Sequence, residues 1–123
     1  MSGLKRKTPL VRRPKAKGNA YEKHISERLR RFFPTAKRNL GSGGYGGGDL
    51  VETPGWSFEC KKVEALNLWK ALAQSEEAAS PTQTPAVVFA RNRSRDYIAF
   101  PFDDWEGMME EIAELRQSLK ELA

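Results

Sequence analysis

The segment from Gly48 to Lys61 is the part of this 123-residue chain that most constrains its fold. Thr53-Pro54-Gly55 lies between two short runs of β-prone residues, which is typical of a hairpin turn. A three-residue loop with glycine in the left-handed conformation would pair Glu52 with Trp56. The segment is therefore predicted to form a β-hairpin.

This register places two carboxylates, Asp49 and Glu59, directly opposite each other. Opposed side chains on antiparallel strands have Cβ atoms about 5 Å apart, and like charges so placed repel unless a positive group lies between them. A divalent cation is the natural candidate. Alternation along the second strand also predicts Ser57 and Lys61 on the carboxylate face. The opposite, apolar face would carry Trp56, Phe58 and Cys60. The alternative reading is a surface hairpin whose polar face meets water.

Length and composition indicate one domain with no membrane segment. No apolar run approaches the roughly 20 residues of a membrane helix, and no apolar segment follows the basic N-terminus as in a signal peptide. We therefore expect a cytoplasmic protein. Cys60 is the only cysteine, which excludes an internal disulfide, and His24 is the only histidine, which disfavours histidine triads and histidine-rich metal sites.

Charge is distributed unevenly along the chain. Residues 1–40 carry a balance of +11 and residues 41–123 a balance of −6, within a net charge of +5. Residues 1–17 are predicted to form a flexible basic arm, separate from a single domain over 18–123, and to contact a polyanion. The alternative is a solubilising tail. The candidate nucleic-acid contacts in the arm are Arg12, Arg13, Lys15 and Lys17.

Residues 19–33 have helical periodicity, and Pro34 is predicted to end the helix. At 100° per residue, Glu22 falls inside the apolar stripe and Glu27 on the opposite, solvent face. A carboxylate aimed at the core is costly without a partner, so Glu22 is predicted to approach the charged hairpin. The alternative is that Glu22 lies at the stripe's edge and reaches solvent or a basic side chain.

A strand is expected over 35–40, followed by the glycine-rich segment 41–48. The glycines allow close approach to a backbone or phosphate, but no Gly-Lys-Ser/Thr precedes a helix as in a phosphate-binding loop of the Walker type. We interpret the segment as an active-site flap with Ser42 and Tyr45 as contacts. A plain flexible connection is the alternative.

The second half predicts a helix over 65–79 and a buried strand over 85–90, joined to the hairpin strand by a right-handed parallel crossover. The expected packing residues of this helix are Leu66, Trp69, Leu72 and Ala73, with Gln74 near one edge. A basic turn follows the strand and is read either as phosphate contacts or as a solvated turn. Its arginines are Arg91, Arg93 and Arg95.

A C-terminal helix is predicted over 103–123, with Asp103 as its N-cap. One apolar seam runs along it at spacings of four and three residues. Its acidic residues outnumber its basic ones seven to two, so it is expected to face away from nucleic acid. Packing on the domain's own core is the expected role of the seam, and pairing with a second copy is the alternative. The seam residues are Met108, Ile112, Leu115, Leu119 and Leu122.

An ordered set of motifs gives the chain a resemblance to a known superfamily. The set comprises Lys17-Gly18-x-x-x-Glu22, the segment Arg38 to Gly43 leading to Asp49-Leu50-Val51, then Phe58-Glu59-Cys60-Lys61, and a helix bearing Gln74. With these, the chain resembles the PD-(D/E)xK nucleases, and within them the archaeal-type Holliday junction resolvases, which include phage-encoded members. Gly48 stands where the superfamily name has proline.

The resemblance implies an α/β fold with a restriction-endonuclease-like core, in which helices flank a mixed central β-sheet. It implies a Mg²⁺-dependent endodeoxyribonuclease, with Mn²⁺ as a possible substitute and no small-molecule cofactor. Asp49 and Glu59, helped by Glu22, would hold the metal, and Lys61 would act on the attacking water. Gln74 would position Lys61 or the phosphate. Further DNA contacts are expected from Arg38 and Lys62.

Enzymes of this kind act as symmetric dimers that nick opposing strands of a four-way junction, so a homodimer bound to branched DNA is expected. Two alternatives stay open. One is a nuclease of the same superfamily that cuts flaps, single strands or duplex DNA. The other is a non-catalytic nucleic-acid-binding module that keeps the fold and the basic arm.

Overall fold

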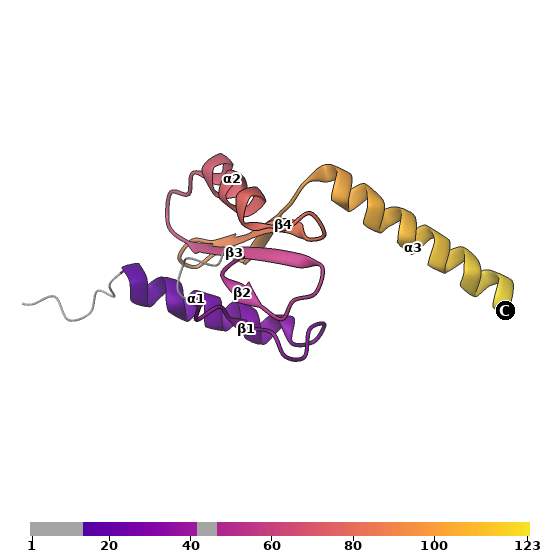
Figure 1. Ribbon diagram of the computed structural model, residues 1–123, viewed down its shortest axis with the longest axis horizontal. Helices are drawn as coiled ribbons and strands as arrows, with labels where there is room; N and C mark the ends of the chain where they lie inside the picture. The colour runs from indigo at the N-terminus through magenta and orange to yellow at the C-terminus, as the bar shows by residue number, and fades with distance from the viewer. Residues whose placement is uncertain (1–13, 42–46) are drawn as a thin grey trace, which may run out of the picture.

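The computed structural model describes residues 14–41 and 47–123. Helices and strands alternate along the chain, and a long helix ends it (Figure 1). The elements are α1 (Pro14–Leu29), β1 (Lys37–Arg38), β2 (Leu50–Val51), β3 (Trp56–Lys62), α2 (Leu68–Ala78), β4 (Thr84–Ala90), β5 (Tyr97–Ala99) and α3 (Phe102–Leu122).

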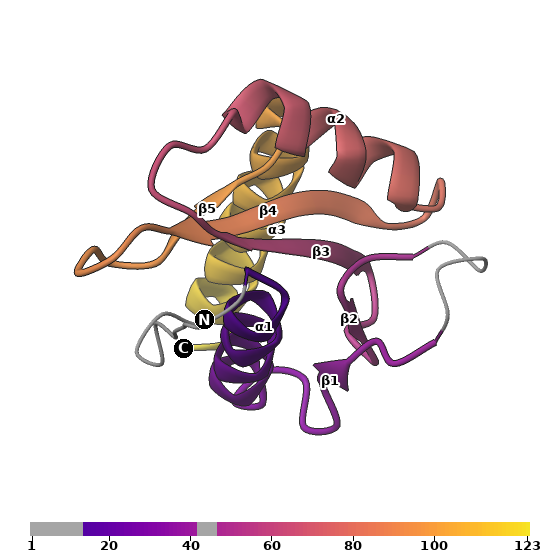
Figure 2. The same cartoon turned by 90° about the vertical axis from the view of Figure 1, so that its left-hand side faces the viewer.

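The main sheet is mixed and has the strand order β3-β4-β5. β3 and β4 are parallel from the pair Trp56↔Thr84 to the pair Lys62↔Ala90, and β5 runs antiparallel to β4. β1 and β2 form a separate two-stranded antiparallel sheet. The two helices α1 and α2 cover opposite faces of the main sheet (Figure 2). The predicted mixed sheet flanked by helices is confirmed, as is the parallel pairing across α2.

The hydrophobic core lies between α1 and the main sheet. Tyr21 and Ile25 of α1 pack on the β3 residues Phe58 and Cys60, as the alternation along the strand predicts. The parallel register adds the inward residues of β4 to the same layer. Cys60 is a free, buried thiol in this layer, and burial raises its pKa. It acts here as a small hydrophobic side chain.

The opposite face of the sheet packs on α2 through small side chains. Ala71 and Ser75 are the buried residues of α2, and Asn67 caps the helix by accepting a hydrogen bond from the Lys70 N–H at 3.1 Å. The predicted contact face was wrong at Trp69, which is 83% exposed, and at Ala73, which is exposed too, whereas the predicted Leu66 and Leu72 are half-buried. Small residues let the helix approach the strands closely, and a tryptophan does not fit that contact.

The predicted two-stranded hairpin is not formed as a ladder, because β2 pairs with β1 and not with β3. Glu52 has a positive φ of 61°, which turns the chain away before the expected Glu52–Trp56 pair. The Trp56 N–H instead donates to the Thr53 carbonyl at 3.0 Å. Gly55, with φ of 85°, takes the left-handed position that the turn chemistry predicts.

The ends of α1 differ from the prediction. The helix begins at Pro14, so the last residues of the predicted arm form its first turn, and it ends at Leu29, five residues before Pro34. Short-range hydrogen bonds then carry the chain from Leu29 to Ala36, which is fully buried. The helix stops early because the chain must turn to place Phe33 and Ala36 against the core.

The C-terminal helix α3 does not pack on the core. It has no buried residue, and it projects away from the sheet (Figure 1). The expected packing of its seam on the domain is therefore wrong. Pro101 occupies the N-cap position without a side-chain hydrogen bond, so the predicted cap at Asp103 is also wrong. Within residues 14–41 and 47–123, no helix has the length and apolar character needed to cross a bilayer.

Asp96 connects the β4–β5 turn to α1. Its carboxylate accepts hydrogen bonds from the Tyr21 hydroxyl at 2.8 Å, from His24 at 3.2 Å and from Arg28 at 2.6 Å. Burial raises the pKa of this carboxyl, but the three hydrogen bonds outweigh that effect and bring its pKa below the ordinary value of 3.8. The exposed His24 is thus tied to Asp96 and does not simply face solvent.

We predict that Asp96→Asn lowers the free energy of unfolding by about 1–2 kcal/mol at neutral pH. Hydrogen bonds to a charged group contribute about 1.5–3 kcal/mol, and solvent partly screens the Asp96 carboxylate. The contribution of Asp96 is present above pH 3.8 and is lost as pH falls through the lowered pKa. Urea unfolding of both proteins, at neutral pH and near pH 3, measures it. Asp103→Asn, on the exposed start of α3, is the control. An equal difference at both pH values would contradict the role of the charge.

Candidate active site

Asp49 is held in place by backbone groups of β3. Its N–H donates to the Phe58 carbonyl at 2.7 Å, and its Oδ2 accepts from the Cys60 N–H at 2.8 Å. Its carbonyl accepts from the Asn39 N–H at 2.8 Å. These bonds connect Asp49 to two segments at once. They place it beside Glu59, although no regular ladder joins β2 to β3.

Gly48 is required for this close approach. A Cβ added at position 48 would lie 2.4 Å from the carbonyl oxygen of Phe58 and 2.9 Å from its nitrogen, and backbone atoms cannot move aside as a flexible side chain can. The Gly48 carbonyl also accepts a hydrogen bond from the side chain of Asn39 at 3.0 Å. Gly48 is therefore the residue that lets the chain pass β3 tightly enough to place Asp49.

Asn39 is a site residue that sequence reasoning missed. Its side chain bonds the Gly48 carbonyl, and its side-chain oxygen accepts from the Gly41 N–H at 3.0 Å. It thereby connects the two ends of the glycine-rich segment. An asparagine two residues before a glycine-rich segment is a weak signal for such a role, because Asn39 and Gly48 become neighbours only after folding.

The carboxylates of Asp49 and Glu59 form a like-charge pair. Burial is the main cause that raises the pKa of Glu59 to about 7, and the Asp49 charge and a hydrogen bond to Asp49 raise it further. The nearby Lys61 ammonium acts in the opposite direction. The predicted proximity of the two carboxylates is confirmed. The arrangement is electrostatically unfavourable when both groups are ionised, unless a cation joins them.

Ser57, Glu59 and Lys61 alternate along β3 with the core residues, as the sequence predicts, and so belong to the sheet face that α2 covers. Ser57 is fully enclosed there, and its hydroxyl is the buried side-chain oxygen without a partner in the part of the chain that the structure describes. Glu59 and Lys61, nearer the open end of the strand, keep partial exposure. The functional part of this face is therefore limited to these two residues.

Glu22 projects from α1 toward the pair, but it already has a basic partner. The Arg38 guanidinium donates to its carboxylate at 3.2 Å. Burial and the Asp49 charge raise the pKa of Glu22, while Arg38 and Lys61 lower it. The structure thus brings Glu22 near Asp49 and Lys61, as predicted. Arg38, expected to contact nucleic acid, forms an ion pair with this carboxylate.

The donor set suits a hard divalent cation. Within the described residues, no three His, Cys, Asp or Glu side chains gather closely enough to ligate one ion. Mg²⁺, however, is commonly bound through one or two carboxylates, with water and substrate phosphate as its other ligands. The Asp49–Glu59 pair supplies that number of carboxylates, and its mutual repulsion favours a cation between them. The residues present therefore fit the metal.

Gln74 lies on α2, which packs on the sheet face that carries Glu59 and Lys61. Its side chain is exposed, and no hydrogen bond joins it to Lys61 among the described contacts. Its positioning role stays a prediction.

A small basic cavity lies beside the end of β3. It has a volume of about 200 Å³, and its lining includes Lys17, His24 and Lys62, with the Tyr21 ring between them. The Lys62 ammonium lies 6.0 Å from the centre of the Tyr21 ring. Lys62 follows Lys61 directly, but alternation along β3 directs its side chain to the α1 face, opposite to Glu59 and Lys61. The predicted contacts Lys17 and Lys62 are therefore brought together.

The basic turn between β4 and β5 starts at the same end of the sheet. Its arginines are exposed, and its first residues are tied to the segment after β3, because the Val63 N–H donates to the Ala90 carbonyl and the Asn92 N–H to the Glu64 carboxylate. The predicted contacts Arg12, Arg13, Ser42 and Tyr45, and the side chain of Lys15, lie outside the part of the chain that the structure describes.

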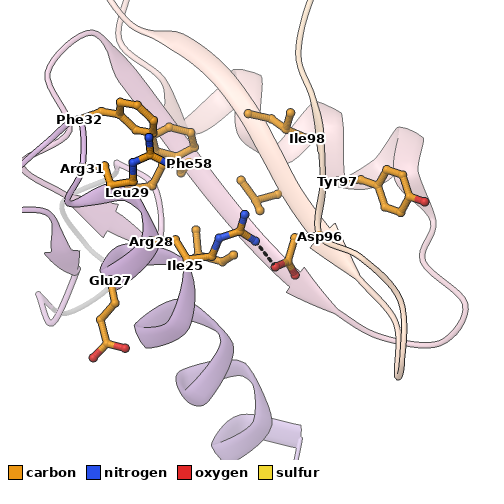
Figure 3. Close-up of a pocket in the computed structure, with 11 residues that line it drawn as sticks. Ile25, Glu27, Arg28, Leu29, Arg31, Phe32, Phe58, Asp96, Tyr97 and Ile98 are labelled. Atoms are coloured by element: carbon orange, nitrogen blue, oxygen red, sulfur yellow. Dashed lines mark hydrogen bonds and ion pairs between the residues drawn. The ribbon is translucent and has the colours of Figure 1, made fainter.

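A larger groove of about 500 Å³ lies between the end of α1 and β5 (Figure 3). Apolar side chains such as Leu29, Phe32 and Ile98 dominate its lining, and the Arg28–Asp96 ion pair crosses it. None of the predicted catalytic residues lines it. The largest described cavity is therefore separate from the carboxylate site.

One comparison with known proteins gives a match. The model of a family described as "phage putative PDDEXK endonuclease" matches residues 13–121 of the chain. No curated protein and no solved structure matches.

We predict that Gly48→Ala destabilises the protein by roughly 1–3 kcal/mol, because its Cβ has no room and must displace Asp49 or Phe58. Chemical unfolding measures the change. Gly107→Ala in α3 is the matched control, since nothing lies within 4 Å of the added carbon there. The control should be neutral or stabilise by up to about 1 kcal/mol through helix propensity. Equal effects of the two substitutions would contradict the tight approach at Gly48.

We predict that the metal-free protein loses stability as pH rises from about 4.5 through about 7, because the folded state binds the Glu59 proton more tightly than the unfolded chain. A pKa difference of one corresponds to about 1.4 kcal/mol, and solvent screening of this partly exposed group reduces the total to roughly 1–2 kcal/mol. Thermal unfolding in chelator between about pH 4.5 and pH 7 measures this loss of stability. Glu59→Gln is the control, and its stability should lack the pH dependence caused by Glu59. A flat difference between the two proteins would show that Glu59 has an ordinary pKa.

Proposed function

The chain belongs to the phage PDDEXK endonuclease family, and within that family we propose that it is a Mg²⁺-dependent DNA endonuclease that resolves four-way junctions. The observation that carries the proposal is the Asp49–Glu59 pair with Lys61 two residues further along β3. Two close carboxylates without a cation are unfavourable in a folded protein, and the order Asp, Glu-x-Lys is the one for which the superfamily is named.

Asp49 and Glu59 would hold the metal, with Glu22 as a further carboxylate close to them. When bound, Mg²⁺ supplies Lewis acid stabilisation of the phosphate and lowers the pKa of a bound water. Mn²⁺ has similar ligand preferences and is expected to substitute. The Cys60 N–H holds one oxygen of Asp49, so this carboxylate is already oriented before any cation arrives, which limits the cost of binding.

Lys61 would act on the attacking water and on the charge that develops at the phosphate. Its ammonium is close enough to lower the pKa of both Glu59 and Glu22, so it lies at the carboxylate site. A cation there orients a water by hydrogen bonding and stabilises a phosphate that gains charge in the transition state. Gln74, on the helix over the same face, would position Lys61 or the phosphate.

Arg38 and Glu22 would act together at the edge of the site. Their ion pair lowers the pKa of Glu22 and so opposes burial and the Asp49 charge, which raise it. A DNA phosphate that approaches Arg38 would compete with Glu22 for the guanidinium. Glu22 would then be free to turn toward the metal, so substrate binding and completion of the ligand set would be linked.

DNA is the substrate expected from the distribution of charge. The cations Lys17 and Lys62 gather in a cavity at the end of β3, and the exposed arginine turn begins at the same end of the sheet. Each phosphate that such cations neutralise releases counterions and strengthens binding at low salt. The N-terminal basic residues are expected to extend this surface.

A four-way junction is the proposed form of that DNA. The proposal rests on the resemblance of Lys17-Gly18-x-x-x-Glu22 and the later motifs to the junction resolvases. Two-fold symmetry of the junction suits a homodimer that nicks opposing strands. A nuclease for flaps or duplex DNA would share the same carboxylates and lysine, so substrate preference separates the two functions.

We predict that Asp49→Asn, Glu59→Gln and Lys61→Ala each lower the cleavage rate by at least about a hundredfold, since each removes a metal ligand or the group that acts on the water. DNA binding should stay within a few-fold. Synthetic four-way, flap and linear substrates of shared sequence, incubated with Mg²⁺ or chelator, measure the effect. Lys120→Ala, a charge removed from the far end of α3, is the matched control for Lys61→Ala.

Symmetric nicks confined to the junction would support the resolvase. Cleavage of all three substrates would replace it with a general nuclease that uses the same residues. Binding without cleavage in any metal would overturn the catalytic role of the three residues. Wild-type turnover in one variant would remove that residue from the mechanism.

A further inference from the structure

The helix α3 carries a long apolar seam that the described structure leaves uncovered. Its 21 residues extend about 31 Å, at 1.5 Å per residue, away from the sheet (Figure 1). Leu115, Leu119 and Leu122 are 63%, 67% and 83% exposed. Single exposed leucines are ordinary, but a continuous row of them along one helix indicates a contact surface.

The spacing of the seam identifies the kind of surface. The intervals between its apolar residues alternate between three and four, so the pattern repeats every seven residues, or two turns of 3.5 residues instead of the 3.6 of a straight helix. Such a repeat defines the narrow seam of a coiled coil, whose partner helix winds around it. The a positions are Trp105, Ile112 and Leu119, and the d positions are Met108, Leu115 and Leu122.

The sequence of α3 contains features that destabilise an isolated helix. Glu106, Glu110 and Glu114 follow one another at intervals of four, so like charges repel along the outer face. Gly107 lies in the helix interior, where glycine has a low helix propensity. No atom lies within 4 Å of a Cβ added there, so close packing does not require a glycine. Stability of α3 is therefore expected to come from the seam. The outer positions are mostly charged, which fits a helix that has one covered side.

We propose that α3 forms a parallel, in-register, two-stranded coiled coil with α3 of a second copy of this chain. Ile112 at an a position followed by Leu115 at a d position is the combination that favours two parallel strands. This coiled coil would be the interface of the homodimer proposed above. Its role in paired cleavage rests on that proposed function. The dimer itself does not depend on the nuclease chemistry.

Charge at the flanking positions selects the parallel direction. In a parallel pair, a g residue of one helix faces the e residue five positions later on its partner. Glu111 at g therefore faces Arg116 of the partner subunit, and the two-fold axis repeats this pair. In an antiparallel pair the g positions face each other, and Asp104 and Glu111 would then lie along an edge that contains no basic residue. The parallel arrangement avoids this repulsion.

The parallel direction also determines where the catalytic domains lie. α3 begins at Phe102, directly after β5 and Pro101, so its N-terminal end is attached to the domain. In a parallel pair both attached ends are together, and the two Asp49–Glu59 sites lie on the same end of the assembly. An antiparallel pair would separate the domains by the length of the helix.

The test begins with the mass of the full chain by light scattering over a range of concentrations. We expect twice the 13.9 kDa of one chain. Leu119→Lys, which places a charge at an a position of the seam, should shift the mass to that of one chain. Gln117→Lys introduces a positive charge on the outer face two residues away and should leave the dimer intact. Circular dichroism checks that both variants remain folded.

Direction is tested by oxidation of Leu122→Cys. Position 122 meets its own copy in a parallel pair and meets position 105 in an antiparallel one, so only the parallel form yields the covalent dimer. The wild-type protein, whose Cys60 is buried, is the control. Glu111→Arg should weaken the dimer, and the double variant Glu111→Arg with Arg116→Glu should restore it.

Several outcomes would overturn the proposal. A chain that is monomeric at all concentrations would show that the seam is covered within one copy or not at all. A dimer without the Leu122→Cys cross-link would show an antiparallel or different interface, and a dimer unaffected by Leu119→Lys would exclude α3. Lys61→Ala should still dimerise, so loss of cleavage with an intact dimer concerns the proposed function alone. Leu119→Lys should still nick single strands but lose the paired product.

Discussion

The carboxylates of Asp49 and Glu59 are held together by backbone hydrogen bonds, and the arrangement of the site depends on that enforced contact. The Phe58 carbonyl and the Cys60 N–H hold Asp49 against β3, where burial and the neighbouring charge raise the pKa of Glu59 to about 7. The fold thus bears an electrostatic cost. Under the proposed function, a divalent cation held between the two carboxylates would remove it.

The elements around this contact each serve its position. Gly48 removes the side chain that would prevent it, and Asn39 bonds the chain on both sides of the glycine-rich segment. α1 is kept in place by the Asp96 cluster and presents Glu22 toward the pair. The same helix brings Lys17 beside Lys62. Helix α1 therefore contributes to the core, to the acidic site and to the basic cavity at the end of β3.

Much of this arrangement was accessible from the sequence, and the failures have physical causes. Alternation along β3 identified the core face, because burial has a clear period. The proximity of Asp49 to Glu59 was predicted from a hairpin register, and backbone hydrogen bonds to β3 produce it without that ladder. The prediction of a hairpin ladder was wrong because Glu52 has a positive φ, which its residue type does not indicate. The face of α2 was wrong because close helix–sheet contact needs small residues such as Ala71, whereas hydrophobicity favoured Trp69. The apolar seam of α3 was visible, but periodicity does not name the partner that covers it.

Proton release on metal binding tests the central electrostatic claim most directly. Calorimetric titration of the DNA-free protein with Mg²⁺ or Mn²⁺ at pH 7, in two buffers of different ionisation heat, counts the protons displaced. With a Glu59 pKa of about 7, binding should release roughly half a proton, because the ligand must be deprotonated. Asp49→Asn should abolish this signal. Binding with no proton release, or release that persists in Asp49→Asn, would contradict a cation shared by Asp49 and Glu59.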